Sequence, residues 1–108
     1  MLKHTSVYIN HFNIVRGEHH FCEICGKPAT GGIHHLEKRG EGKDIPGLLM
    51  ALCMEHHTMC EDKKVCNQYA KEVHARFILC NPYQHPEKFS ERTFLTQKLK
   101  MELLYKDS

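Results

Sequence analysis

Two short pairs of metal-ligand residues constrain this chain more than any other feature of its sequence. Cys22-x-x-Cys25 and Cys53-x-x-His56 are separated by roughly thirty residues, and each pair keeps its two donor atoms close together. Gly26, directly after Cys25, allows the sharp backbone turn that such a pair needs. Thiolate and imidazole donors in this arrangement are typical of a tetrahedral structural zinc site. We therefore predict that one zinc ion is bound by Cys22, Cys25, Cys53 and His56.

The sequence leaves other roles open for these side chains. The thiols could be small buried packing residues, and His56 could be a surface histidine. Cys60 follows His56 by one helical turn and could replace it as the fourth ligand, although its spacing from Cys53 is less usual. Two further cysteines have no paired partner in the sequence, and we interpret both as packing residues: Cys66 and Cys80.

Length and composition are those of one soluble globular domain. The chain has 108 residues, of which 41% are hydrophobic and 26% charged, and it contains no tryptophan. Its core must therefore be modest, and a zinc ion that supplies about 10–16 kcal/mol of apparent binding free energy would help it to fold. The net charge of +2 permits a nucleic-acid partner without requiring one.

Targeting features are absent from the sequence as it stands. No apolar run reaches the ~18 residues that a membrane-spanning helix needs. The first residues are interrupted by polar side chains and lack the apolar core of a signal peptide. We therefore expect a cytoplasmic protein with no membrane partner, in which the cysteines stay reduced and serve metal binding.

Local patterns predict a small α+β fold. Apolar positions in residues 5–15 favour a helix over a strand, and residues 33–36 form a short apolar run that predicts a strand. Glycines and prolines make residues 22–32 turn-rich, and residues 38–47 are expected to form a loop. Residues 48–79 are expected to form a short approach followed by one or two helices.

Two amphipathic helices are expected in the second half of the chain. An apolar stripe at a spacing of four residues marks the first: Val65, Tyr69, Val73 and Phe77. His74 is expected at an exposed or half-buried position of this helix, which Pro82 and Pro86 bring to an end. Ser90 is the expected N-cap of the last helix. The stripe expected to face the core in that helix is Leu95, Leu99 and Leu103.

Two adjacent histidines lie between the two ligand pairs. In a strand, His34 and His35 point to opposite sides, so only one of them can face a given metal ion. If residues 54–66 are helical, His57 and Glu61 share one face of that helix. The alternative is that both loop histidines are simply exposed, that His57 has no role, and that Glu61 is a solvated surface residue.

In order and spacing these motifs resemble the HNH endonucleases, also called ββα-metal nucleases, and most of all their small zinc-stapled phage-type members. The segments that carry the resemblance read CEIC, IHHLEKRGEGKD and CMEHH, and it covers roughly residues 8–79. It implies a ββα-metal core over residues 22–80, an N-terminal helical extension over 1–21 and a C-terminal helix over 81–108. It also implies a bacterial or phage-infected cell as the setting.

The resemblance further implies a function. His34, His57 and Glu61 would bind a catalytic Mg²⁺ or Mn²⁺ ion, and His35 would be the general base in hydrolysis of DNA phosphodiester bonds. The asparagine of the family falls at Leu48, so the tie that it provides to the base-bearing loop is missing, and Asp44 is the candidate substitute. We expect DNA phosphates to be contacted, with little sequence specificity, by Lys38, Arg39 and Lys43.

Two alternatives to a nuclease remain. A catalytically degenerate zinc module could bind nucleic acid or protein without cleaving it, since the loss of the asparagine bears on catalytic rate and leaves metal binding intact. A redox role for Cys22-x-x-Cys25 is disfavoured, because no βαβ pattern surrounds this motif.

Overall fold

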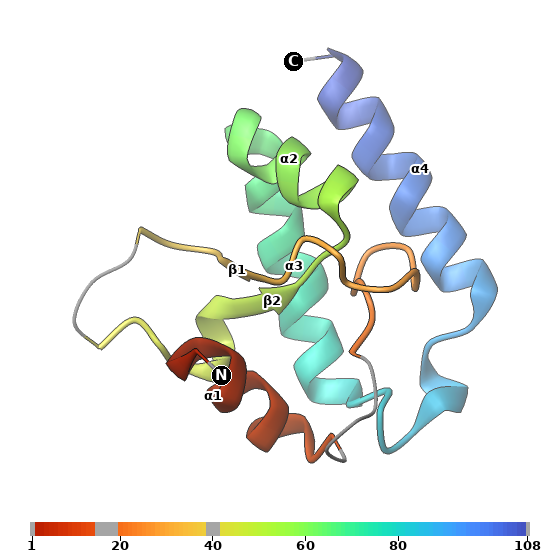
Figure 1. Cartoon of the computed structure of the whole chain (residues 1–108). Coiled ribbons are helices and arrows are strands. Elements are labelled where there is room, and N and C mark those ends of the chain that lie inside the picture. Colours follow the sequence, from red (N-terminus) through yellow and green to blue (C-terminus); the bar gives the residue numbers. More distant parts are fainter. Residues whose placement is uncertain (1, 15–19, 39–41, 108) are drawn as a thin grey trace.

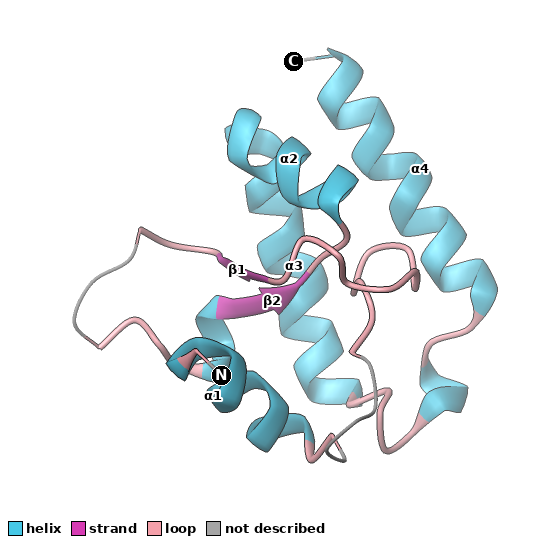
Figure 2. Cartoon of the chain, viewed as in Figure 1, coloured by secondary structure: helices cyan, strands magenta, loops and turns pink. Residues whose placement is uncertain are grey.

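A short antiparallel hairpin lies at the centre of the molecule (Figures 1 and 2). The computed structural model describes residues 2–14, 20–38 and 42–107. Strand β1 (Ile33–His35) pairs with strand β2 (Leu49–Ala51), with His34 opposite Met50. The expected loop between them ends in the 3-10 turn η1 (Pro46–Leu48). The expected strand over residues 33–36 is thus confirmed, one residue shorter than predicted.

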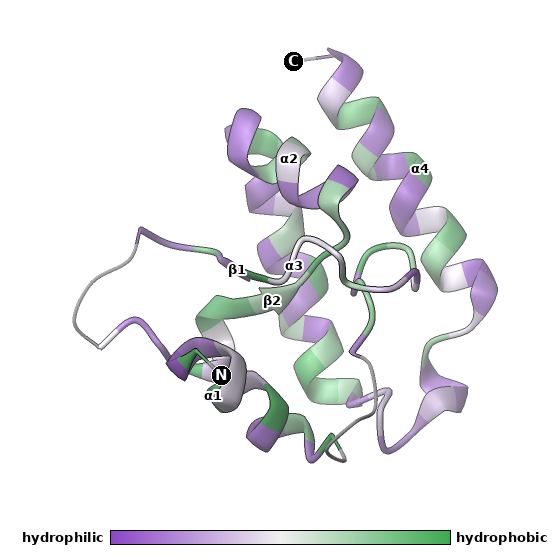
Figure 3. Cartoon of the chain, in the orientation of Figure 1, coloured by the Kyte–Doolittle hydropathy of each residue, from purple (hydrophilic) through white to green (hydrophobic). Residues whose placement is uncertain are grey.

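Alternation along the strands divides the core into two clusters. Leu49 and Ala51 of β2 pack with aromatic residues of one cluster, and Met50 packs into the other. Strand β2 is hydrophobic over its whole length, and every one of its residues is buried (Figure 3). On β1, Ile33 joins the first cluster, and the next residue, His34, is buried at the opposite side. The hairpin therefore separates the two clusters.

Helices cover the hairpin on several sides (Figure 1). Helix α1 (Lys3–Phe12) packs against both strands and contributes the fully buried Tyr8 and Phe12, which confirms the helix expected near the N-terminus. Helix α2 (Met54–Asp62) follows β2 and packs against α3 (Lys64–Cys80), which in turn packs against α4 (Glu91–Asp107). The α+β class predicted from the sequence is confirmed.

The buried face of α3 agrees with the predicted stripe in its second half. Val73 and Phe77 are buried, whereas Val65 and Tyr69 are only partly buried against the core. The most buried positions of its first half are Cys66 and Ala70. The helix ends at Cys80, where Asn81 takes a left-handed conformation with φ of 45° ahead of the first proline.

Helix α4 presents a different face to the core from the one predicted. Ser90 is its N-cap as expected, since its hydroxyl accepts a hydrogen bond from the Thr93 amide at 3.3 Å. The predicted core stripe is wrong, because three leucines are at least half exposed: Leu95, Leu99 and Leu103. Gln97 and Met101 are buried instead, and the Gln97 amide donates to the backbone carbonyls of Glu23 and Ile24. Buried carbonyl groups need hydrogen-bond donors, which favours the rotation of α4 that turns Gln97 towards Glu23 and Ile24.

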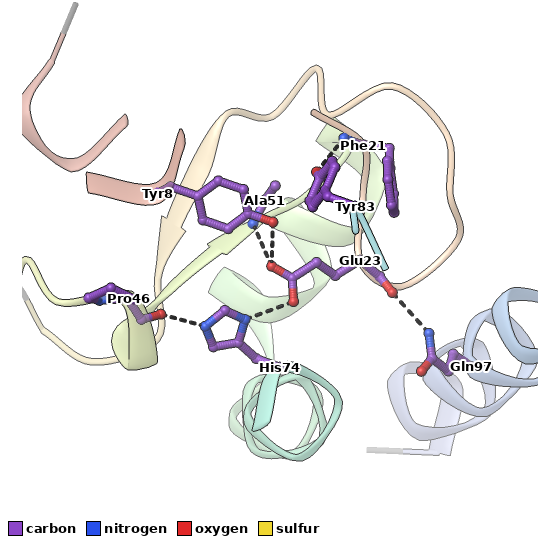
Figure 4. Close-up of polar contacts among 8 residues, drawn as sticks. All are labelled: Tyr8, Phe21, Glu23, Pro46, Ala51, His74, Tyr83 and Gln97. Atoms are coloured by element: carbon purple, nitrogen blue, oxygen red, sulfur yellow. Dashed lines mark hydrogen bonds and ion pairs between the residues drawn. The ribbon is translucent and has the colours of Figure 1, made fainter. Parts of the chain in front are cut away.

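A buried polar network joins distant parts of the chain (Figure 4). The carboxylate of Glu23 accepts hydrogen bonds from the Tyr8 hydroxyl at 2.7 Å, the His74 ring at 2.7 Å and the Ala51 amide at 3.3 Å. The other ring nitrogen of His74 donates to the Pro46 carbonyl at 2.6 Å. The exposed or half-buried position expected for His74 is therefore wrong, because this partner set draws the ring into the core.

Within the described part of the chain, no helix is both long and apolar enough to span a membrane.

Candidate functional site

The predicted zinc ligands form a cluster that can hold a metal ion. Donor atoms of Cys22, Cys25, Cys53 and His56 all lie within 4.8 Å of one another. The Cys25 and Cys53 sulfurs are 3.9 Å apart, and His56 Nδ1 lies 3.7 Å from the Cys22 sulfur and 3.2 Å from that of Cys53. A tetrahedral zinc ion requires edges of about 3.8 Å between sulfurs and about 3.6 Å between sulfur and nitrogen. The observed distances therefore fit zinc.

Backbone turns hold the ligands of this cluster in place. Cys22 and Cys25 belong to a tight turn in which the Gly26 amide donates to the Cys22 carbonyl at 2.8 Å. Gly26 has φ of 79°, a conformation that side-chain-bearing residues rarely adopt, which explains the glycine at this position. Cys53 is the residue that caps the start of α2, so His56 lies in the first turn of that helix.

Electrostatics within the cluster favour thiolates at Cys25 and Cys53. Hydrogen bonding from Cys22 lowers the pKa of Cys25 to about 3 and that of Cys53 to about 6. The pKa of Cys22 itself is raised, because its thiol is the donor in both contacts. Burial alone lowers the pKa of His56, but its contacts with Cys25 and Cys53 outweigh burial and raise it. Deprotonated sulfurs are the form that binds a metal ion.

The remaining cysteines lie outside this cluster. Cys60 is buried, burial raises its pKa to about 12, and it is not among the four clustered donors. The alternative in which Cys60 replaces His56 is therefore not supported by the geometry. Cys66 is fully buried in the core and Cys80 is half-buried against it, in agreement with packing roles.

A second group of donor atoms lies beside the first. His34 on β1 and His57 and Glu61 on α2 place their donor atoms within 4.8 Å of one another. Glu61 Oε1 is 3.3 Å from His57 Nε2 and 3.8 Å from His34 Nδ1. His57 and Glu61 share one face of the helix, as their spacing of four residues predicts. The His34 Nδ1 atom is buried and forms no hydrogen bond within the described residues, as is expected of an atom that can bind a metal ion.

This second group opens into a cavity of about 410 Å³. Side chains from β1, from the segment that follows it, and from both adjacent helices line this cavity: Ile33, His34, His35, Leu36, Glu37, Lys38, His57, Cys60, Glu61 and Asn67. Burial lowers the pKa of His34, so its ring is neutral and able to act as a ligand. The cavity is lined by both histidines of β1.

His35 points away from His34, as strand alternation predicts. Its Nε2 atom lies 3.1 Å from Asp44 Oδ1, and its ring packs edge-on against His4 of α1 with ring centres 4.8 Å apart. Asp44, the residue considered as a substitute for the asparagine missing at Leu48, therefore contacts the predicted base directly. This contact fixes the orientation of the imidazole.

Two of the three predicted phosphate-binding cations are described by the structure. Lys38 is exposed and lines the cavity. Lys43 pairs with Glu37 at 3.0 Å, and Lys71 lies 3.9 Å from the same carboxylate. Arg39 lies outside the described residues. Lys38 is thus the predicted cation that the cavity itself presents.

Asn67 on α3 is a site residue that the sequence interpretation missed. Its Oδ1 atom lies 2.7 Å from His34 Nε2, and its Nδ2 atom donates to the Leu36 carbonyl at 2.8 Å. Asparagine is a poor helix former, and Asn67 lies on the same helix face as Ala70 and His74, which are buried. A polar residue of low helix propensity on a buried face is the signal that could have identified it.

Gly31 explains how closely the two donor groups approach. A Cβ atom at this position would lie 2.9 Å from the Cys53 carbonyl oxygen and 2.9 Å from the Cβ atom of His57. Only glycine lets the chain before β1 contact the start of α2, the helix that carries ligands of both groups.

Comparisons of the chain with protein-family models, curated proteins and solved structures found no match.

Proposed function

We propose that this protein is a metal-dependent endonuclease of the HNH type that hydrolyses DNA phosphodiester bonds. The observation that carries the proposal is the division of the histidine pair on β1. His34 faces His57 and Glu61, while His35 faces Asp44 at the rim of the same cavity. One histidine thereby faces the candidate metal ligands, while its neighbour is oriented by Asp44. The order of β1, β2 and α2 along the chain agrees with a ββα-metal core.

His35 of the chain accounts for the first proton movement of hydrolysis. The His35 imidazole, oriented by Asp44, takes a proton from water as the water oxygen bonds to phosphorus. The bond from phosphorus to the 3′ oxygen breaks, and this oxygen receives a proton from solvent. His34, His57 and Glu61 would hold a divalent ion, which would supply Lewis-acid stabilisation of the negative charge on the phosphate and the leaving oxygen.

The two donor sets suit different ions. Three thiolates and one imidazole suit zinc, which we propose as the structural ion. Two imidazoles and one carboxylate suit Mn²⁺ better than Mg²⁺, because Mg²⁺ prefers oxygen ligands. We propose Mn²⁺ or Mg²⁺ as the catalytic ion, with the higher activity in Mn²⁺.

DNA is the proposed partner, with recognition of its backbone and not of its bases. Lys38 lies at the cavity, where its ammonium group can contact a phosphate next to the cleaved one. Lys43 and Arg39 are proposed to extend this contact along the strand. Phosphate contacts carry little sequence information, so cleavage should show little sequence preference.

Plasmid nicking tests the proposal. Zinc-loaded wild-type protein is expected to nick supercoiled DNA in Mn²⁺ or Mg²⁺, and His35→Ala is expected to lose this activity by 10²-fold or more. The control is His11→Ala, which removes an exposed histidine of α1 and should leave nicking unchanged. Unchanged nicking in His35→Ala would rule out this residue as the base. DNA binding without cleavage in any divalent ion would instead favour the degenerate binding module.

A further inference from the structure

We infer that Asn67 of α3 is a positioning residue that fixes the tautomer of His34 and thereby aims its Nδ1 lone pair at the second metal site. The inference rests on the proposed function for its catalytic meaning, but the geometry behind it is independent of any activity. Asn67 lies outside the hairpin and α2, the elements that carry the ligands.

The hydrogen bonds of Asn67 determine which way its amide faces. The Leu36 backbone carbonyl can only accept, so the group 2.8 Å from it must be the Nδ2 donor of Asn67. The Oδ1 atom therefore faces His34 Nε2 at 2.7 Å. The reversed amide would place two acceptor oxygens against each other.

The orientation of the amide then decides where the proton of His34 resides. Because Asn67 Oδ1 can only accept, the Nε2 atom of His34 must carry the proton and donate it. A neutral imidazole has one protonated nitrogen, so Nδ1 is left with a lone pair. That atom is buried, lies 3.8 Å from Glu61 Oε1, and has no hydrogen-bond partner among the described residues. Partners of this kind commonly change metal affinity by 10–100-fold.

The same side chain also restrains the loop that follows β1. Its Nδ2 atom holds the Leu36 carbonyl, one residue beyond His35, and the Leu36 amide donates to the Leu48 carbonyl at 2.9 Å. Asn67 on α3 therefore restrains the backbone of the segment that follows the proposed base, His35. This contact restrains the segment even though position 48 is a leucine.

The experiment measures the His34 tautomer and Mn²⁺ affinity on zinc-loaded full-length protein. Long-range ¹H–¹⁵N correlation spectra at neutral pH should show the Nε2–H tautomer of His34 in the wild type and a mixture in Asn67→Ala. Calorimetric titration with Mn²⁺ alone should show 10–100-fold weaker binding in Asn67→Ala. Asn67→Asp retains an acceptor for His34 and should keep the Nε2–H tautomer. The matched control is Gln68→Ala, an exposed neighbour on the same helix, which should match the wild type.

Three results would overturn the inference. The first is an Nδ1–H tautomer of His34 in the wild type. The second is a folded Asn67→Ala variant with an unchanged His34 tautomer. The third is a Mn²⁺ affinity of Asn67→Ala equal to that of Gln68→Ala. The first needs no variant, so a poorly folded Asn67→Ala cannot obscure the test. A protein that shows the expected tautomer and Mn²⁺ effects but never nicks DNA supports the positioning role and refutes the nuclease.

Discussion

At the residue scale, the contact between Glu23 and His74 is the most demanding feature of the core. Both side chains are essentially inaccessible to solvent, and both ring nitrogens of His74 face oxygen acceptors. Burial alone lowers the pKa of His74, but its contacts with Glu23 outweigh burial and raise it, which favours the doubly protonated ring. Burial raises the pKa of the Glu23 carboxyl against the opposing effect of His74. The pair is tolerated at this depth because each partner satisfies the hydrogen bonds of the other (Figure 4).

Removing one partner should therefore be costly. His74→Ala would leave the Glu23 carboxylate buried without its positive partner, and we expect a loss of about 3–5 kcal/mol in the free energy of unfolding. Denaturant titration of the zinc-loaded protein measures this loss. The control is His85→Ala, because His85 is exposed and its contact with Glu87 should contribute less than about 1 kcal/mol. Equal stability of the two variants would contradict a structural role for the pair.

At the scale of elements, helix α4 shows why periodicity alone does not identify a buried face. Two apolar stripes run along it, one through Leu95 and Leu99 and the other through Phe94 and Met101. Only the second packs against the core, where Met101 is fully buried. Both stripes have helical spacing, so spacing alone does not identify the buried face. The hydrogen bonds from Gln97 to the Glu23 and Ile24 carbonyls favour burial of the face that carries Met101.

Truncation of one residue from each stripe should show the difference. Met101→Ala is expected to lower the free energy of unfolding by about 2–5 kcal/mol, because it opens a cavity in the core. Leu99→Ala removes a half-exposed side chain and should change it by less than about 1 kcal/mol. Thermal and denaturant unfolding of both variants measure these values. A larger loss for Leu99→Ala would mean that α4 packs through its leucine face.

At the scale of the whole molecule, the cysteine cluster joins two segments that are far apart in the sequence. It connects the turn around Cys22 to the start of α2, and α2 then supplies His57 and Glu61 to the second donor group. The two hydrophobic clusters on either side of the hairpin are small. Loss of an ion bound by this cluster should therefore affect the fold and the second donor group together.

Metal removal tests this dependence. Purified protein should contain about one tightly bound zinc ion, and a strong chelator should unfold it, because about 10–16 kcal/mol of binding free energy exceeds the margin of most small domains. Circular dichroism and a chromophoric zinc assay follow the two events. Cys53→Ser should lose both zinc and fold, whereas Cys80→Ser, outside the cluster, should retain both. A metal-free protein with an unchanged spectrum would end the zinc proposal.

Features set by the chain's own periodicity could be predicted from the sequence. The spacing of the ligand pairs, the alternation of His34 and His35, and the shared helix face of His57 and Glu61 follow from local geometry. These rules hold over a few residues wherever the element lies. They predict which residues within one segment can share a site, whereas the grouping of His34 with His57 and Glu61 came from the resemblance to the HNH endonucleases.

Features that depend on which distant segments meet were decided by the tertiary structure. Asn67 reaches His34 across 33 residues and His74 reaches Glu23 across 51, and no local pattern links either pair. The rotation of α4 likewise follows from carbonyls that Glu23 and Ile24 leave in need of a donor. Burial of polar groups must be satisfied by whichever partners the fold brings near, and only the packed chain determines which partners those are.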